Sequence, residues 1–154
     1  MNKQEIYDYL DELDVFDYTV NDDLTVDGRY NVNLYNMIME DELPFNFNHV
    51  KGIFEIDKNG LTSLKGCPKI VGNGFYCNDN LLTTLENGPV EVNGGYYCEN
   101  NQLTSLEGSP KWVGGDFLCF NNYLTDLKGG PEYVGRDFFC HRNLLTSLEG
   151  CPKH

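Results

Sequence analysis

The sequence is poor in basic residues. Lysine and arginine together number 11, against 24 aspartates and glutamates, and the formal net charge at pH 7 is −13. A protein of this sign repels the phosphates of nucleic acids and attracts basic proteins. We therefore expect no direct binding to DNA or RNA.

Residues that carry catalysis or bind metals are also scarce. The histidines are His49, His141 and His154, and the sequence contains no Cys-x-x-Cys pair. Local motifs of this composition assemble neither a metal site nor a nucleophile with its base. Cys140 and His141 are adjacent, but neighbouring residues on a strand point to opposite faces. We expect no catalytic residue, no cofactor and no metal ion, and hence not an enzyme.

Two further absences concern location. The chain has no apolar run long enough to cross a bilayer, so we expect no membrane association. Met1 is followed by an acidic, polar stretch that lacks the basic and apolar segments of an export signal. These features predict one soluble domain in the cytoplasm.

What the sequence contains instead is a repeat of about 21 residues. Each unit reads aromatic-x-Cys-x-x-Asn-x-Leu-x-x-Leu, which matches the kernel of leucine-rich repeats, where every repeat makes one short strand and a turn. The columns that keep this period are the first leucine of Leu-Thr-x-Leu (Leu61, Leu82, Leu103, Leu124 and Leu145), a proline (Pro68, Pro89, Pro110, Pro131 and Pro152) and a cysteine (Cys77, Cys98, Cys119 and Cys140).

Stacked turns, about 4.8 Å apart, superimpose identical positions of successive repeats. Alternation along each strand directs the aromatic and cysteine columns to one face, which we interpret as the core. At the bend, an asparagine column can pair with backbone groups: Asn80, Asn101, Asn122 and Asn143. Before each proline stands a residue that breaks helices, so the back of each coil should be extended or turn-like: Gly66, Asn87, Gly108, Gly129 and Gly150.

The N-terminal segment departs from the repeat. Residues 3–13 space their apolar side chains as in an amphipathic helix, and residues 18–20 and 24–26 flank a turn-prone triplet as in a β-hairpin. We predict a cap over residues 1–31 and a leucine-rich-repeat solenoid over residues 32–154. The solenoid should hold one parallel β-sheet of about six short strands, centred near residues 33, 55, 76, 97, 118 and 139.

The cysteines and the last repeat give two expectations. The four cysteines of the column should be buried and reduced, whereas Cys67 and Cys151, at a turn position, should react with a thiol reagent. No C-terminal cap is visible after the strand at Asp137–Cys140. Its edge should be exposed, which predicts homo-oligomerisation through the C-terminal turn or cover by a partner.

The repeat unit resembles a known group of proteins. Leu-Thr-Ser-Leu-Glu-Gly-x-Pro followed by Val-Gly-Gly-x-Phe-x-Cys-x-x-Asn is similar to the short leucine-rich-repeat proteins of bacteriophages and bacteria, and the similarity extends over most of the chain. The resemblance implies a repeat fold and recognition of another protein, and it brings no catalytic residue. By analogy, the chain would be a bacteriophage factor that binds or inhibits a host defence protein in the host cytoplasm.

The strand positions that point away from the core are the candidate site. We expect them to form a concave aromatic strip of a few hundred Å² that binds a protein partner. Its predicted members are Tyr76, Tyr97, Leu118 and Phe139, flanked by Phe120, Tyr123 and His141. Cover of one column by a loop or a second copy, or a reversal of the inner and outer columns, would remove this strip.

Two other functions stay open at this level. Residues 1–60 hold 14 acidic and 4 basic side chains, whereas residues 61–154 hold 10 and 7. An acidic N-terminal pole of this kind could imitate nucleic acid in the basic groove of a DNA- or RNA-acting enzyme, or simply keep the cap soluble. The open C-terminal turn, in contrast, suits a self-associating structural module.

Overall fold

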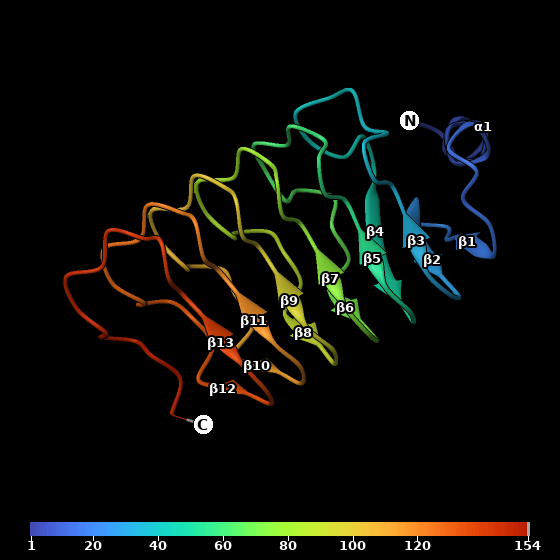
Figure 1. The fold of residues 1–154 in the computed structure, drawn as a ribbon. Helices are drawn as coiled ribbons and strands as arrows, with labels where there is room; N and C mark the ends of the chain where they lie inside the picture. Colours follow the sequence, from blue (N-terminus) through green and yellow to red (C-terminus); the bar gives the residue numbers. More distant parts are fainter. Residues whose placement is uncertain (154) are drawn as a thin grey trace.

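The structure, a computed structural model, describes residues 1–153. The chain winds into a β-solenoid whose coils stack side by side from the N-terminal helix to the C-terminus (Figure 1). This architecture confirms the predicted repeat solenoid. None of the helical segments in residues 1–153 has the length and apolar character needed to span a membrane.

The helix α1 (Lys3–Glu12) closes the N-terminal end. The Asn2 side chain accepts a hydrogen bond from the Glu5 N–H at 3.0 Å, and the Glu5 carboxylate accepts one from the Asn2 N–H at 2.7 Å. This capping box fixes the first turn. Ile6 and Leu10, one turn apart, are buried on the core side of the helix. The predicted amphipathic helix is confirmed.

A hairpin follows the helix. Strands β1 (Tyr18–Val20) and β2 (Thr25–Gly28) pair antiparallel, as predicted. Within the turn, the Asp23 carboxylate accepts hydrogen bonds from the N–H and the hydroxyl of Thr25. The other edge of β2 pairs parallel with β4 (Asn46–Val50), so the hairpin also begins one of the solenoid's sheets.

The predicted sheet is present, and we call it the front sheet. Its six strands are β3 (Val32–Asn33), β5 (Phe54–Glu55), β7 (Phe75–Tyr76), β9 (Tyr96–Tyr97), β11 (Phe117–Leu118) and β13 (Phe138–Phe139). Neighbours in this order pair in parallel and in register. Identical repeat positions therefore lie beside one another, as expected.

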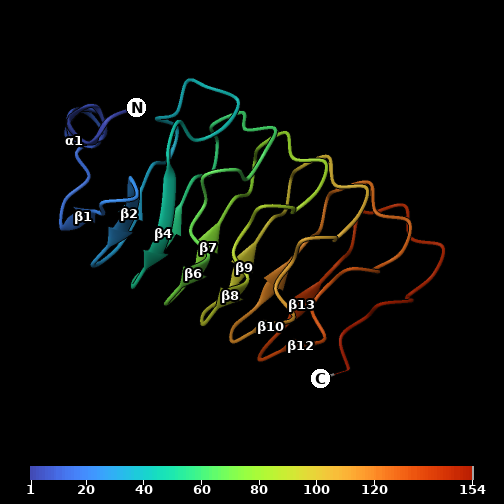
Figure 2. The ribbon, with the colours of Figure 1, turned by 180° about the vertical axis from the view of Figure 1, so that it is seen from behind.

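A second sheet, the back sheet, was not predicted. It contains β1, β2 and β4 and continues through β6 (Ile70–Val71), β8 (Glu91–Val92), β10 (Trp112–Val113) and β12 (Tyr133–Val134). Figure 2 shows these strands as a row seen from behind. The back is extended, as expected, but the pairing of its segments into a sheet was not predicted, because strands of two residues are too short to show alternation. The buried valines of these strands form the back side of the core.

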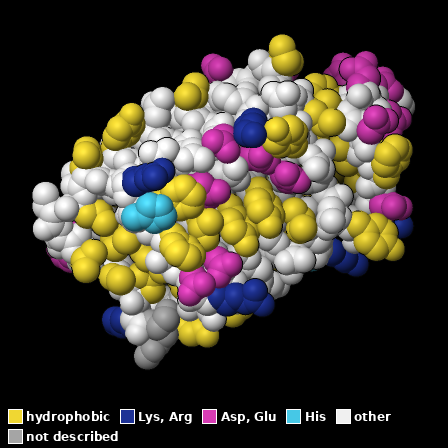
Figure 3. Space-filling view, viewed as in Figure 1, with side chains coloured by type: hydrophobic (Ala, Val, Ile, Leu, Met, Phe, Trp, Pro, Cys, Tyr) yellow, Lys and Arg dark blue, Asp and Glu magenta, His cyan; other side chains and the backbone are white. Residues whose placement is uncertain are grey.

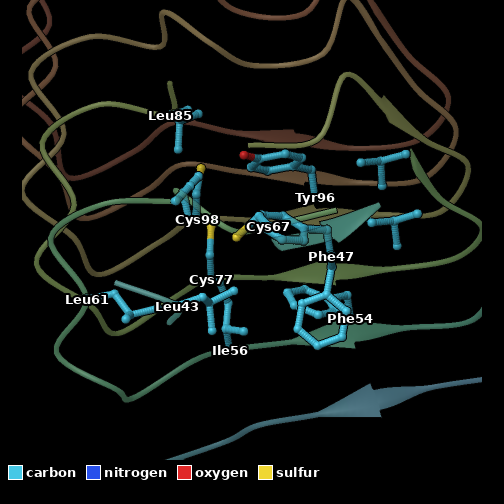
Figure 4. Close-up of a cluster of buried hydrophobic side chains, with 14 of the residues drawn as sticks. Leu43, Phe47, Phe54, Ile56, Leu61, Cys67, Cys77, Leu85, Tyr96 and Cys98 are labelled. Carbon is cyan, nitrogen blue, oxygen red and sulfur yellow. The ribbon is translucent and has the colours of Figure 1, made fainter. Parts of the chain in front are cut away.

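The core is built from columns of identical type. Phe54, Phe75, Tyr96 and Phe117 have no exposed surface, and the Phe54 and Phe75 rings stack with centroids 6.1 Å apart. The inner and outer columns are therefore assigned correctly. Figure 4 shows the rings of Phe54 and Tyr96 beside Cys77 and Cys98, with the Tyr96 hydroxyl directed toward the cysteine sulfurs. That hydroxyl has no hydrogen-bond partner in the described part of the chain.

The asparagine column satisfies the backbone at the bend. Asn101 donates from Nδ2 to the carbonyls of Cys77 and Cys98, at 3.0 and 3.1 Å, and its Oδ1 accepts from the Leu82 N–H at 3.0 Å. Asn80 and Asn122 make the equivalent bonds one coil earlier and later. Each side chain ties two coils together, as expected from the sequence.

The column before the prolines has left-handed backbone. Gly108 has a φ of +92°, and Asn87 occupies the same region at +67°. A Cβ on Gly108 would collide with the Leu85 backbone of the preceding coil. Both facts explain why this position excludes most residues.

The cysteines differ from the prediction at Cys67 and, in part, at Cys140, which is half-buried and not buried. Cys67 is buried, because the turn before Pro68 directs its side chain inward to the same core as Cys77. Cys77, Cys98 and Cys119 are fully buried, Cys140 is half-buried and Cys151 is exposed. The expectation that Cys67 would be accessible was wrong.

We predict that one cysteine reacts rapidly in the native protein. Cys151 should be alkylated by iodoacetamide first and Cys140 more slowly, whereas burial raises the pKa of the Cys67, Cys77 and Cys98 thiols and blocks access to them. Intact mass spectrometry over time measures the number of labels. All six sites should label in denaturant, and equal rates at all six in native protein would contradict the buried column.

The C-terminal coil leaves the core open. Leu148 is 66% exposed, although Leu127, at the same position one coil earlier, is fully buried. Phe138, Cys140 and Leu145 are only half-buried, whereas their counterparts in the preceding coil are inaccessible. Within residues 1–153, β13 pairs with β11 alone. Within residues 1–153, apolar side chains and a strand edge of this coil are therefore left uncovered.

Candidate protein-binding face

The outer surface of the front sheet carries two columns of side chains. The first runs through Glu55, Tyr76, Tyr97, Leu118 and Phe139, which pair in register from strand to strand. The second lies two residues further along each coil and contains Asp57, Asn78, Glu99, Phe120 and His141. We define the aromatic strip as Tyr76, Tyr97, Leu118, Phe139, Phe120 and His141. Figure 3 shows hydrophobic side chains gathered across this face, with acidic groups beside them.

Two tyrosines form one half of the strip. The rings of Tyr76 and Tyr97 stack with centroids 4.3 Å apart and planes inclined by 11°. A Cβ on Gly95 would lie 2.7 Å from Cε2 of Tyr97, and a Cβ on Gly74 would lie 2.7 Å from Cε2 of Tyr76. The absence of a side chain at these glycines lets the rings lie against the sheet. Burial, with a contribution from Tyr76, raises the pKa of Tyr97 to about 12.

Three rings form the other half. Phe120 and His141 stack with centroids 4.7 Å apart and planes inclined by 7°. Phe139 meets His141 edge-on at 6.4 Å and is 42% exposed. Leu118 separates these rings from the tyrosines. The structure thus brings six of the seven predicted residues onto one face.

Tyr123, the seventh predicted residue, lies elsewhere. It follows the asparagine bend and lines a groove on the next side of the coil, together with Asn100, Gln102 and Asn121. It is 54% exposed. The sequence could not separate it from the strip, because the direction of the chain after the bend depends on the asparagine bonds.

The strip is an open sheet face. Strands run along two sides of the coil, and both sheets share the spacing of about 4.8 Å that hydrogen bonding imposes. Figure 1 accordingly shows the coils stacked side by side rather than bent into a horseshoe. The concave shape of the strip stays a prediction, and a partner would meet an open sheet face.

Comparisons with known proteins identify no relative. No family model matches the chain, and neither does any curated protein or solved structure. The functional argument consequently depends on the chemistry of this face.

Carboxylates beside the tyrosines were missed by the sequence analysis. Asp57 is 6% exposed, and its Oδ1 is buried without a hydrogen-bond partner, as is Oε2 of Glu99. Burial raises the pKa of Glu99 to about 7, and the charges of Asp79 and Asp57 add to the rise. Burial also raises the pKa of Asp57. The sequence analysis places most of the acidity in the N-terminal cap. Only the register of the coils puts Asp57 and Glu99 on the same face.

An exposed aromatic pair on the back sheet was also missed. Trp112 and Tyr133 occupy the same position of successive strands and stack with centroids 6.0 Å apart. The available signal was their spacing of one repeat, but the residues at this position in earlier coils, Ile70 and Glu91, are not aromatic. In residues 1–153, no three His, Cys, Asp or Glu side chains are grouped so as to hold a metal ion.

Proposed function

We propose that this protein is a non-enzymatic binding module that recognises another protein through the aromatic strip. The observation that supports this function is a row of ordered, stacked rings on the solvent face of a sheet. Contiguous apolar surface of this kind on a soluble protein marks interaction sites, and aromatic residues dominate binding energy there. A rigid sheet also loses little conformational entropy when it binds.

The resemblance to bacteriophage repeat proteins extends the proposal. The partner would be a host protein, such as a defence factor, and binding would inhibit it in the host cytoplasm. This extension is an analogy, and the surface chemistry supports only the protein-binding part.

Alanine variants test the strip. Tyr97→Ala and Phe139→Ala should each weaken capture of a partner from host lysate by roughly thirtyfold, because truncation of a central aromatic anchor commonly costs about 2 kcal/mol. Tyr30→Ala and Phe16→Ala, which truncate exposed rings outside the strip, are the matched controls. Affinities are measured by titration once mass spectrometry has identified the captured protein. Equal binding by all four variants would contradict the proposal.

The salt dependence of the affinity distinguishes binding through the strip from nucleic-acid mimicry. Apolar contacts weaken little as ionic strength rises, whereas a row of exposed carboxylates in a basic groove loses affinity steeply. The same complex is therefore titrated at low and high salt. A steep loss that strip variants do not alter would favour the acidic N-terminal pole as the binding site.

Self-association is a second candidate, favoured by the open C-terminal coil. The exposed Leu148 and the free edge of β13 form a template for a second copy. Light scattering at high protein concentration should detect oligomers, and Leu148→Lys should abolish them because it buries a charge in the contact. Leu81→Lys, at an exposed leucine away from this end, is the control. A strict monomer at every concentration would exclude this mode of assembly.

A further inference from the structure

The side of the solenoid just after the asparagine bend carries a groove of about 290 Å³. We call it the bend groove, and it is lined by Leu81, Gln102, Tyr123 and the asparagines beside them, all uncharged. Charged residues make up 23% of the sequence, and other grooves include them, such as Lys65 and Lys69 in one. The lining of the bend groove offers no counterion to a charged ligand, so a neutral ligand fits it best.

Side-chain carboxamides form one wall of the bend groove. Asn121 donates from Nδ2 to Oδ1 of Asn100 at 2.8 Å, and Asn100 donates from Nδ2 to Oδ1 of Asp79 at 3.0 Å. These bonds orient the carboxamides along the solenoid. Oδ1 of Asn121 receives no hydrogen bond from residues 1–153, so it can accept one from a ligand. A wall that is oriented in advance loses little conformational entropy on binding.

The fold explains these asparagines but not the side chains beside them. Asn100 and Asn121 both have a φ of +55°, a left-handed conformation that asparagine tolerates. Gln102 and Tyr123 lie two residues further along their coils, where both are exposed and neither side chain forms a hydrogen bond within residues 1–153. The preceding coil has Leu81 at this position, so the repeat imposes no residue type there.

Gln102 lies at the centre of the bend groove. The N–H groups of Leu81, Gln102 and Tyr123 each donate to the preceding coil at 2.9 Å, so the three residues are equivalent positions of successive coils. The spacing of the coils puts the backbones of Leu81 and Tyr123 about 10 Å apart, one on each side of Gln102. Tyr123 is 54% exposed and Leu81 is 46% exposed. A free carboxamide is thus flanked by an exposed ring and an exposed leucine.

A saccharide matches this set of groups. Sugar hydroxyls donate and accept hydrogen bonds, as carboxamides do, and the C–H face of a sugar ring packs on the negative face of an aromatic ring. An extended peptide fits less well, because pockets for its alternate side chains give specificity, and the described lining has apolar side chains at Leu81 and Tyr123 alone.

We infer that the bend groove binds a neutral saccharide. A sugar ring packs on Tyr123, and its hydroxyls form hydrogen bonds with the Gln102 carboxamide and with Oδ1 of Asn121. This site goes beyond the proposed function, since the aromatic strip lies on the front sheet and the bend groove lies on the next side of the coil.

Titration with oligosaccharides tests the inference. The probes are maltohexaose, xylohexaose and chitohexaose, which are neutral and differ in their sugar units. We expect at least one to bind the whole protein with a Kd of about 1 mM or lower, detected by amide chemical-shift changes at Gln102 and Tyr123. Because the contact is uncharged, raising NaCl from about 0.05 to 0.5 M should alter the Kd by less than about twofold.

Variants locate the contact. Gln102→Ala and Tyr123→Ala should each weaken binding of the best saccharide by roughly tenfold, whereas Tyr123→Phe, which keeps the ring, should weaken it by no more than about threefold. Both residues are exposed, so the variants should fold. Tyr30→Ala and Tyr97→Ala, which truncate rings outside the bend groove, should bind as the unaltered protein does.

Three results would overturn the inference. The absence of shift changes with all three probes up to about 10 mM would exclude a saccharide site of useful affinity. Binding that Tyr123→Ala leaves unchanged would place the sugar elsewhere on the protein. A neutral peptide, N-acetyl-Ser-Gly-Ser-Gly-Ser-amide, should not bind; if it binds as tightly as the best saccharide and is weakened equally by Gln102→Ala, the groove takes a peptide main chain. Lysate capture decides the proposed function separately.

Discussion

Phe117→Ala should lower the free energy of unfolding by about 3–5 kcal/mol, which is the usual cost of removing a buried phenylalanine. Phe117 has no exposed surface, and its ring stacks on Tyr96 at 5.3 Å and on Phe138 at 5.5 Å. Alanine would leave a cavity within the column that joins three coils. Urea denaturation followed by circular dichroism measures the change.

Phe139→Ala is the matched control for that measurement. Phe139 carries the same side chain on the opposite face of the front sheet and is 42% exposed. Its truncation should alter stability by no more than about 1 kcal/mol, because little buried area is lost. A larger loss for Phe139→Ala than for Phe117→Ala would mean that the core and solvent faces are exchanged.

Asn101→Leu should destabilise the protein by more than about 3 kcal/mol, since several buried backbone groups lose their partner at once. The Leu82 N–H and the carbonyls of Cys77 and Cys98 all bond to this one side chain. Leucine has a similar volume, so the effect would come from the hydrogen bonds rather than from a cavity.

Gln102→Leu tests whether a leucine anywhere in this bend lowers stability, or only one that replaces the hydrogen bonds of Asn101. Gln102 is the next residue, exposed, and its side chain makes no hydrogen bond within the described chain. Stability should change by less than about 0.5 kcal/mol. Thermal and urea unfolding of both variants provide the comparison, and similar losses for the two would refute the structural role of the asparagine column.

The sequence predicted the repeating parts well because each structural residue type recurs at the same position of successive repeats. The asparagine, cysteine and leucine columns each recur at one period, and their burial and bonding follow from that register. The helix over Lys3–Glu12 and the hairpin were predictable for a different reason, since a capping residue, apolar spacing and turn residues act locally.

The back sheet shows where local patterns become insufficient. Its strands from β6 onward hold two residues each, and a pair such as Ile70–Val71 carries no periodicity. The strands form because the neighbouring coils place their backbone groups in range, which is a tertiary effect. Cys67 is buried for a similar reason, as the turn before Pro68 is oriented by the coils on either side.

The candidate site, too, could be predicted from the sequence only in part. The sequence alone determined that Tyr76, Tyr97, Leu118 and Phe139 share a face, because residues one repeat apart superimpose in a solenoid. Only the tertiary structure decided that Tyr123 lies apart and that Glu99 and Asp57 have unpaired, buried oxygens beside the rings. Burial and hydrogen-bond satisfaction depend on side chains from different coils, and no spacing along the chain encodes them.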